Sequence, residues 1–166
     1  MGTMIEESIG DAVKALMKQD VELAKKVMSG DAEIDRTERK IEDLCLRLLL
    51  QQQPVARDLR NISAALKMVT DMERIGDHAT DISELAIVLS EKKYVKKLDH
   101  IEEMARETMV MLIQSLEAYV EKDLDKAQKV IAHDDVIDDL FEEVKQELIE
   151  LIRNHADEGE QAVDLL

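Results

Sequence analysis

The chain has 166 residues and a formal net charge of −16, with 45% hydrophobic but only 2% aromatic residues. The hydrophobic content is too high for a disordered chain, and a composition rich in Ala, Leu, Glu and Lys, with one proline, favours helices over strands. The negative charge disfavours nucleic acid and anionic membranes as partners and favours cations and basic protein surfaces. We therefore expect an all-α protein that binds no nucleic acid.

The chain shows no sign of an export signal or a membrane anchor. No segment resembles a signal peptide, and no apolar run approaches the roughly 20 residues that a membrane-spanning helix needs. The single cysteine, Cys45, lies on an apolar helix face and cannot form an internal disulfide, which predicts a buried thiol. These features predict a cytoplasmic protein without direct membrane insertion.

Helical periodicity begins near the N-terminus. The first apolar pattern runs from Ile5 to Met28. The residues Ser29–Asp31 then resemble a turn, with Asp31 as a candidate N-cap of the next helix. The second pattern, Ile34–Leu49, stops before Pro54, because the residue before a proline disfavours helix. We thus expect two helices joined by a turn at Ser29–Asp31.

The later elements follow the same logic. A third helix is expected over Pro54–Ser90, with proline in its first turn. The basic segment Ser90–Lys97 is either a solvated hinge or a contact for an acidic partner. Further helices are expected over Ile101–Tyr119 and Val136–Ile152, and Arg153–Gln161 breaks the pattern. The chain therefore contains five long helices.

The two halves of the chain repeat each other. Position 20 and position 123 are both Asp, and a shift of 103 residues aligns further positions without a gap. The matched pairs include Ala15 with Ala118, Ala24 with Ala127, Asp31 with Asp134, Ile34 with Ile137 and Asp35 with Asp138. Residues 1–92 then form one three-helix repeat, and residues 98–166 form a second. Because the chain has only 166 residues, we expect the second repeat to lack its third helix and to expose apolar faces that favour association.

An acidic edge follows the third predicted helix. Glu73, Asp77, Asp81 and Glu84 follow one another at four- and three-residue steps, where like charges repel each other. One interpretation is a solvated face. The other is a site for a hard cation such as Mg²⁺, Mn²⁺, Ca²⁺ or Fe³⁺, which prefers oxygen ligands. A mid-helix glycine, Gly76, is compatible with the site and equally with close helix packing.

The opposite side of this helix and the other acidic clusters have simpler explanations. An apolar stripe alternates in steps of four and three, which predicts a core seam: Met68, Met72, Ile75, Ala79, Ile82, Ala86 and Leu89. Asp31 and Asp35, like Asp134 and Asp138, are interpreted as charges at helix starts. No nucleophile arrangement, phosphate-binding glycine loop or Glu-x-x-His motif is present, so we expect no enzyme.

One stretch resembles a known family. The segment LLLQQQPVARDLRNISAALKMVTDMERIGDHATDISELA, from Leu48 to Ala86, is similar to the signature of the PhoU family, the accessory regulators of bacterial phosphate uptake. It contains Gln-Pro-Val, Asp-Leu-Arg, Ala-Leu-Lys and Glu-Arg-Ile-Gly-Asp-His in order and without gaps. The resemblance implies an elongated α-helical bundle of two three-helix repeats, of which this chain lacks the last helix.

The resemblance also implies a function and a site. Family members carry a Glu/Asp-x-x-x-Asp motif that can hold an iron or zinc cluster at the surface, with Mg or Mn as further candidates. Here it matches Glu73 with Asp77, and Asp77 with Asp81. The implied role is non-catalytic: negative regulation of the phosphate regulon through the ATPase subunit of a phosphate ABC transporter and a sensor histidine kinase, with a homodimer expected. The alternative is a metal-binding helical oligomerisation module without a regulatory role.

Overall fold

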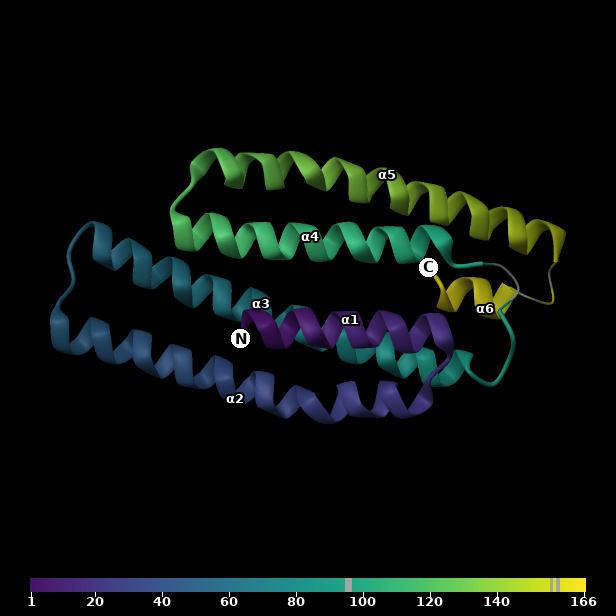
Figure 1. The fold of residues 1–166 in the computed structure, drawn as a ribbon, viewed down its shortest axis with the longest axis horizontal. Helices are drawn as coiled ribbons and strands as arrows, with labels where there is room; N and C mark the ends of the chain where they lie inside the picture. Colours follow the sequence, from purple (N-terminus) through teal and green to yellow (C-terminus); the bar gives the residue numbers. More distant parts are fainter. Residues whose placement is uncertain (95–96, 156, 158) are drawn as a thin grey trace.

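The computed structural model is an elongated bundle of helices in two layers, α1–α3 and α4–α5 (Figure 1). It describes residues 1–94, 97–155, 157 and 159–166, and within these residues there is no strand. The helices are α1 (Gly2–Lys18), α2 (Val21–Gln52), α3 (Arg57–Leu89), α4 (Asp99–Glu121), α5 (Leu124–Asn154) and the short α6 (Gly159–Asp164). The all-α prediction is confirmed, and five of the helices are long. No helix in the described residues has both the length and the apolar character needed to cross a membrane.

The hairpins α1–α2 and α4–α5 are built in the same way. Gln19 ends α1 in the left-handed conformation with φ 54°, and Lys122 ends α4 with φ 58°. The next residue caps the second helix in both cases. The Asp20 carboxylate accepts a hydrogen bond from the backbone N–H of Leu23, and the Asp123 carboxylate accepts one from Lys126. The two turns are 103 residues apart, which agrees with the repeat in the sequence.

The turn predicted at Ser29–Asp31 is wrong. The helix α2 runs through this segment without interruption, and the real turn lies ten residues earlier, at Gln19 and Asp20. The Ser29 hydroxyl donates to the carbonyl of Lys26 instead of capping a new helix. Packing overrides the local turn propensity, because Val27 and Ile34 belong to one buried cluster on either side of this segment.

The predicted core seam of α3 is confirmed at Met72, Ala79, Ala86 and Leu89, whereas Met68, Ile75 and Ile82 are only partly buried. Its buried residues recur every three or four positions: Val69, Met72, Gly76, Ala79, Ser83, Ala86 and Leu89. Gly76 lies directly against α2, since a Cβ atom added there would be 3.1 Å from Ile34 Cδ1. Small residues along this seam thus let α3 approach α2 closely.

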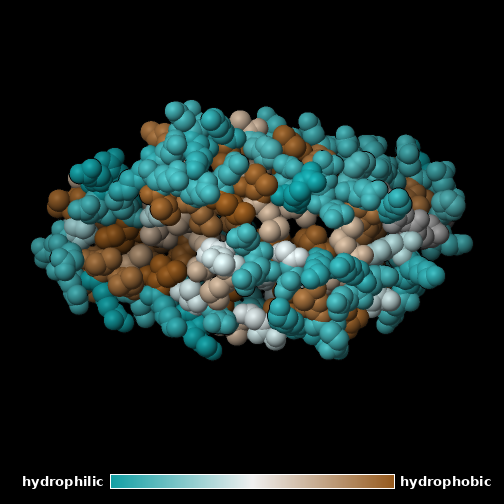
Figure 2. Space-filling view, viewed as in Figure 1, coloured by the Kyte–Doolittle hydropathy of each residue, from teal (hydrophilic) through white to brown (hydrophobic). Residues whose placement is uncertain are grey.

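Two clusters of buried side chains form the core. The buried residues of one come from α1, α2 and α3, around Ile5 and Ala79, and Leu112 of α4 is among the partly buried residues that pack against it. The other connects the two repeats: Ala15, Leu16, Ala24, Ala86, Leu89, Leu98, Val144, Leu148, Ala162 and Leu165. Cys45 is buried, as predicted. Hydrophobic side chains also gather at the surface along the seam between α4 and the α1–α3 layer (Figure 2).

The two predicted breaks contain more order than expected. The segment Ser90–Lys97 connects α3 to α4, and its residues Val95 and Lys96 lie outside the described residues. The Tyr94 hydroxyl donates a hydrogen bond to the backbone carbonyl of Leu16 in α1. Within Arg153–Gln161, which includes the undescribed Ala156 and Glu158, α5 ends and α6 begins. The sequence pattern did not predict α6, because a six-residue helix is too short to show periodicity.

Candidate functional site

The acidic edge lies on the middle of α3. Glu73 is partly buried, whereas Asp77 and Asp81 are exposed. Their common helix places them at successive turns, about 6 Å apart along the axis. The helix α2 packs beside α3, so side chains of α2 also face the acidic edge.

The electrostatics of Glu73 show which residues face it. Burial raises the pKa of Glu73 above its ordinary value, and the neighbouring carboxylates of Asp77, Glu38, Asp35 and Asp31 raise it further. Asp77 lies on α3, and the other three lie on α2. The structure therefore brings two of the three predicted site residues, Glu73 and Asp77, together with a row of carboxylates from the neighbouring helix.

The pKa values of two α2 carboxyls, Asp31 and Glu38, are raised in the same way. Burial raises the pKa of Asp31, and Asp35 and Asp77 add to the effect. Burial also raises the pKa of Glu38, with further contributions from Glu42 and Asp35. Each group thus takes up a proton more readily than an isolated carboxyl would, chiefly because burial disfavours the charged form and secondly because neighbouring carboxylates repel it.

One hydroxyl group contacts this cluster. The Thr80 Oγ1 atom is buried and makes no hydrogen bond of normal geometry. A weaker contact with Asp31 acts against the other influences and lowers the pKa of that carboxyl. Thr80 follows Asp77 by three residues and lies on the same side of α3. It extends the polar surface between α2 and α3 by one turn.

Asp81 is placed differently from the other two predicted ligands. Its carboxylate lies 3.5 Å from Nδ1 of His78, one turn earlier on α3, and both side chains are exposed. Asp81 does not contribute to the pKa of any carboxyl in the α2–α3 cluster. Asp81 therefore follows Asp77 on α3 but pairs with His78 and does not face the carboxylates of α2.

The chemistry of the cluster suits a hard cation. Asp31, Asp35, Glu38, Glu73 and Asp77 offer only oxygen ligands, and a bound cation would relieve their mutual repulsion. As the side chains are placed, no three His, Cys, Asp or Glu residues in the described part of the chain surround a common metal position. Binding would therefore require rotation of these side chains toward one another.

The α2 half of the cluster was missed by sequence analysis. Asp31 and Asp35 were interpreted as charges at a helix start, which is wrong because both lie well inside α2. Their equivalents Asp134 and Asp138 likewise lie inside α5, not at its start. The spacing of Asp31, Asp35 and Glu38 in steps of four and three would have revealed a shared face if α2 had been read as one continuous helix.

A second group of polar contacts joins α4 to α5. His133 Nε2 lies 2.9 Å from Glu107 Oε2, and His100 Nδ1 lies 3.0 Å from Glu147 Oε1. The hydrogen bond to His133, together with one from Arg106, lowers the pKa of Glu107. These pairs connect the two helices of the hairpin.

Comparison with known proteins identifies the family. The family model described as the PhoU domain matches residues 1–86 and again residues 101–166. The chain belongs to the PhoU family. A second match in the second half agrees with the internal repeat, and PhoU proteins are accessory proteins of phosphate-specific transport.

Curated PhoU relatives share much of the sequence. A PhoU homolog of Clostridium acetobutylicum is 41% identical over 92% of this chain and 70% of its own length. A homolog of Aquifex aeolicus is 40% identical over 90% of this chain and 67% of its own length. PhoU of Escherichia coli is 33% identical over 90% of this chain and 62% of its own length. The chain therefore spans roughly two thirds of these relatives.

Solved PhoU structures have the same fold. The crystal structure of PhoU from Pseudomonas aeruginosa matches with a TM-score of 0.95 and 31% identity, over 99% of this chain and 79% of that one. The phosphate transport system regulatory protein PhoU from Streptococcus pneumoniae matches with a TM-score of 0.88 and 26% identity, over 99% of this chain and 78% of that one. The PhoU-like bundle predicted from the sequence is thus confirmed.

Proposed function

We propose that this chain is a non-catalytic regulator of phosphate uptake that represses the phosphate-starvation response when phosphate is sufficient. The match to phosphate-transport accessory proteins along nearly the whole chain, at up to 41% identity, is the observation that carries the proposal. The structural match to a protein described as a phosphate transport system regulatory protein supports the same role.

The partners we propose are the ATPase subunit of a phosphate ABC transporter and a sensor histidine kinase, contacted by a homodimer. A long bundle with a net charge of −16 presents acidic faces to basic partner surfaces. Association through such faces weakens as salt screens the charges, over a Debye length of about 8 Å at physiological ionic strength. Lys92 and Lys93, which are exposed between α3 and α4, offer a smaller basic contact for an acidic partner.

Complementation tests the proposed regulation. The chain would be expressed in a bacterium whose own PhoU has been deleted, grown with abundant phosphate, and the activity of a phosphate-starvation reporter such as alkaline phosphatase would be measured. We expect the reporter to be repressed toward its wild-type level. A reporter that stays fully active, although the chain is folded and abundant, would contradict the proposal and favour a helical oligomerisation module without regulatory function.

We further propose a cation site at the α2–α3 carboxylate cluster. The specific observation in its favour is that α2 places Asp31, Asp35 and Glu38 beside Glu73 and Asp77 of α3, so that carboxylates from two helices face one another and a shared cation would stabilise them. Iron, zinc, magnesium and manganese are the candidates, with Glu73 and Asp77 as the central ligands and Asp81 as a peripheral one.

Elemental mass spectrometry of the purified, untagged chain tests the cation site. The parent would be compared with the Glu73→Ala/Asp77→Ala double variant, and with Glu84→Ala as a control on an exposed carboxylate of α3 that does not influence the cluster. We expect metal in the parent and in the control but not in the double variant. Equal metal contents in the parent and the double variant would contradict the site.

A further inference from the structure

The face of the α2–α3 pair that carries the carboxylate cluster changes character along its length. On α3, Leu59, Leu66 and Glu73 follow one another in steps of seven, which keeps them on one side of the helix. On α2, Glu42 and Leu49 are related in the same way. The face is therefore acidic over one half and aliphatic over the other, and the cation site proposed above uses only the acidic half.

The packing of the two helices brings their aliphatic halves together. The helices are joined by residues 53–56 and pack side by side, with Ile34 of α2 against Gly76 of α3. Counting from this contact toward the connection, Leu50 lies at about the level of Leu59, and Leu46 lies one turn nearer the carboxylates. The two helices thus form one continuous surface, with leucines next to the connection and carboxylates beyond them.

The aliphatic half of this surface is open to solvent. Leu46 is 50%, Leu50 is 80% and Leu59 is 46% exposed, and Ile62 and Leu66 beside them are partly buried. Exposed aliphatic side chains are common singly, but a group of them rimmed by charged residues marks a site of protein contact.

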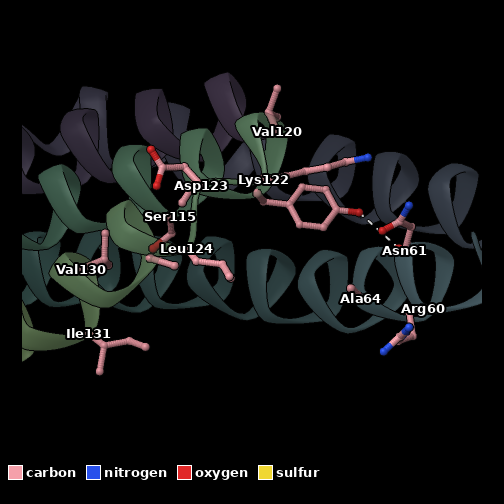
Figure 3. A pocket seen from close by; sticks show the side chains of 13 residues that line it. Arg60, Asn61, Ala64, Ser115, Val120, Lys122, Asp123, Leu124, Val130 and Ile131 are labelled. Atoms are coloured by element: carbon pink, nitrogen blue, oxygen red, sulfur yellow. Dashed lines mark hydrogen bonds between the residues drawn. The ribbon is translucent and has the colours of Figure 1, made fainter. Parts of the chain in front are cut away.

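The described helices that pack against α2 and α3 lie on other sides of the pair. Thr37 faces α1, since its Oγ1 lies 3.8 Å from Sδ of Met4, and Thr37 is about 100° around α2 from Glu38. Asn61 faces α4, where its carbonyl accepts a hydrogen bond from the Tyr119 hydroxyl, 3.2 Å away (Figure 3). Leu59, two residues earlier, is about 200° around α3 from Asn61. The face therefore points outward from the bundle.

The acidic half offers carboxylates that basic side chains of this chain do not neutralise. Arg39 pairs with Asp35 at 3.6 Å, and Lys67 pairs with Asp71 at 2.7 Å. Within the described part of the chain, no lysine or arginine forms an ion pair with four further carboxylates: Asp31, Glu38, Glu73 and Asp77. Charge complementarity thus favours a basic ligand on this half, and the adjoining leucines favour an apolar one.

We propose that this face binds an amphipathic helix of a partner protein, with lysines or arginines over one half of its bound side and aliphatic residues over the other. From Asp31 to Leu50 the face follows about 29 Å of α2, which a helix of about 20 residues would match. The aliphatic half would cover Leu46, Leu50 and Leu59. An anionic membrane is a poorer partner, because the carboxylates would repel it. The inference rests on the proposed function in one respect, that a regulator contacts partner proteins.

Designed peptides test the proposal. The first probe is a fluorescein-labelled, alanine-based helix of about 20 residues, with leucines on one side of its first half and lysines on the same side of its second half. A second probe has the halves exchanged, since a helix can lie on the face in either direction, and a third has the same composition distributed around the helix. Each is titrated with the full chain in the presence of a chelator, and its fluorescence anisotropy is recorded. We expect one patterned probe to bind at least about tenfold more tightly than the third.

Two pairs of variants locate the bound peptide. Leu46→Ser/Leu59→Ser should weaken binding at least about tenfold, because it removes the exposed apolar contacts. Ile131→Ser/Val136→Ser is the matched control, since these side chains are 73% and 40% exposed on α5, and affinity should stay within about twofold.

The charged half is tested in the same way. Glu38→Gln/Glu73→Gln should weaken binding about fivefold, and this effect should shrink in 1 M salt, where the Debye length is about 3 Å. Asp135→Asn/Asp139→Asn removes the same charge from exposed positions of α5 and should leave the affinity within about twofold.

Three results would overturn the proposal: equal affinity for all three probes, unchanged affinity of Leu46→Ser/Leu59→Ser, or a dimer in sedimentation that this variant dissociates, because a second copy would then occupy the face. The complementation experiment keeps the regulatory function separate. A chain that represses the reporter but binds neither patterned probe overturns this inference alone. A chain that binds a patterned probe but does not repress the reporter overturns the regulatory function alone.

Discussion

The two repeats use the same hairpin in different surroundings. In the first repeat α3 covers the hairpin, and α1 has five buried residues: Ile5, Ile9, Ala12, Ala15 and Leu16. In the second repeat α6 lies at one end of the equivalent face, and Met109, Leu112 and Leu116 of α4 pack against the first repeat. Among the described residues of α4, Ala118 alone is buried. The caps at Asp20 and Asp123 are nevertheless the same. The comparison shows that local sequence builds the hairpin, whereas the covering helix determines how much apolar surface it buries.

The largest expected difference between the repeats concerns one pair of equivalent isoleucines. Ile34→Ala should lower the free energy of unfolding by about 3 kcal/mol, because Ile34 is buried between α2 and α3. Ile137→Ala should lower the free energy of unfolding by only about 1 kcal/mol, because one side of Ile137 faces a hollow of about 410 Å³. Urea denaturation followed by circular dichroism measures both. Equal losses would mean that the second hairpin is covered as completely as the first.

The second prediction concerns the close contact that the covering helix makes. Gly76→Val should destabilise the protein by about 2 kcal/mol, since even a Cβ atom would lie 3.1 Å from Ile34. Gly30→Ala is the matched control on the other side of the interface. Nothing lies within 4 Å of a Cβ added at Gly30, so better helix propensity should stabilise the protein by about 0.5–1 kcal/mol. Thermal unfolding of both variants would test this. A Gly76→Val variant as stable as the parent would contradict the close contact between Gly76 and Ile34.

The third prediction concerns a feature that the repeats share. Asp20→Ala and Asp123→Ala should each cost about 1 kcal/mol, because each removes the carboxylate that caps a long helix. The two losses should be equal within experimental error if the hairpin turns are truly equivalent. Chemical denaturation of the two single variants gives the comparison, with Asp125→Ala, on the exposed first turn of α5, as a smaller control effect.

The smallest expected effect concerns the carboxylate cluster and pH. The pKa of Glu73 is raised in the folded protein, so the folded state holds its proton more tightly and its stability falls as pH rises through that raised pKa. Glu73→Gln should therefore stabilise the metal-free protein at pH 7 by a few tenths of a kcal/mol, the size of a like-charge repulsion on a helix. The gain should vanish near pH 4, where Glu73 is protonated. Urea unfolding of the parent and of Glu73→Gln at pH 7 and at pH 4, in the presence of a chelator, measures the gain in stability. An equal gain at the two pH values would contradict the claim that the Glu73 carboxylate is repelled by its neighbours.

The sequence predicted the features that depend on composition and periodicity. The all-α fold, the α3 seam through Met72 and Ala79, the burial of Cys45 and the repeat of the hairpins were all visible in the order of residues. The turn at Ser29–Asp31 was predicted wrongly because Gly30 and its neighbours have turn propensity, whereas Val27 and Ile34, one turn before and one turn after Gly30, are buried in one cluster and hold the helix together. Tertiary packing decided this case.

The candidate site was only half visible in the sequence. Glu73 and Asp77 were identified from their spacing on one helix. Their partners Asp31, Asp35 and Glu38 lie about 40 residues away in sequence on α2, and pairing between helices is set by the packing of Gly76 against Ile34. No periodicity within one helix contains that information. The pairing of Asp81 with His78 was likewise invisible, because side-chain direction at the helix surface follows from local contacts.

Hydrogen exchange of the backbone amides tests most directly the claim that the two repeats differ in their cover. Opening free energies would be compared between the first half of α2, residues 21–34, and its repeat equivalent in α5, residues 124–137. The structure predicts that the α5 amides exchange through a smaller opening, because fewer buried apolar contacts must be broken there. Equal protection of the two segments would contradict this account.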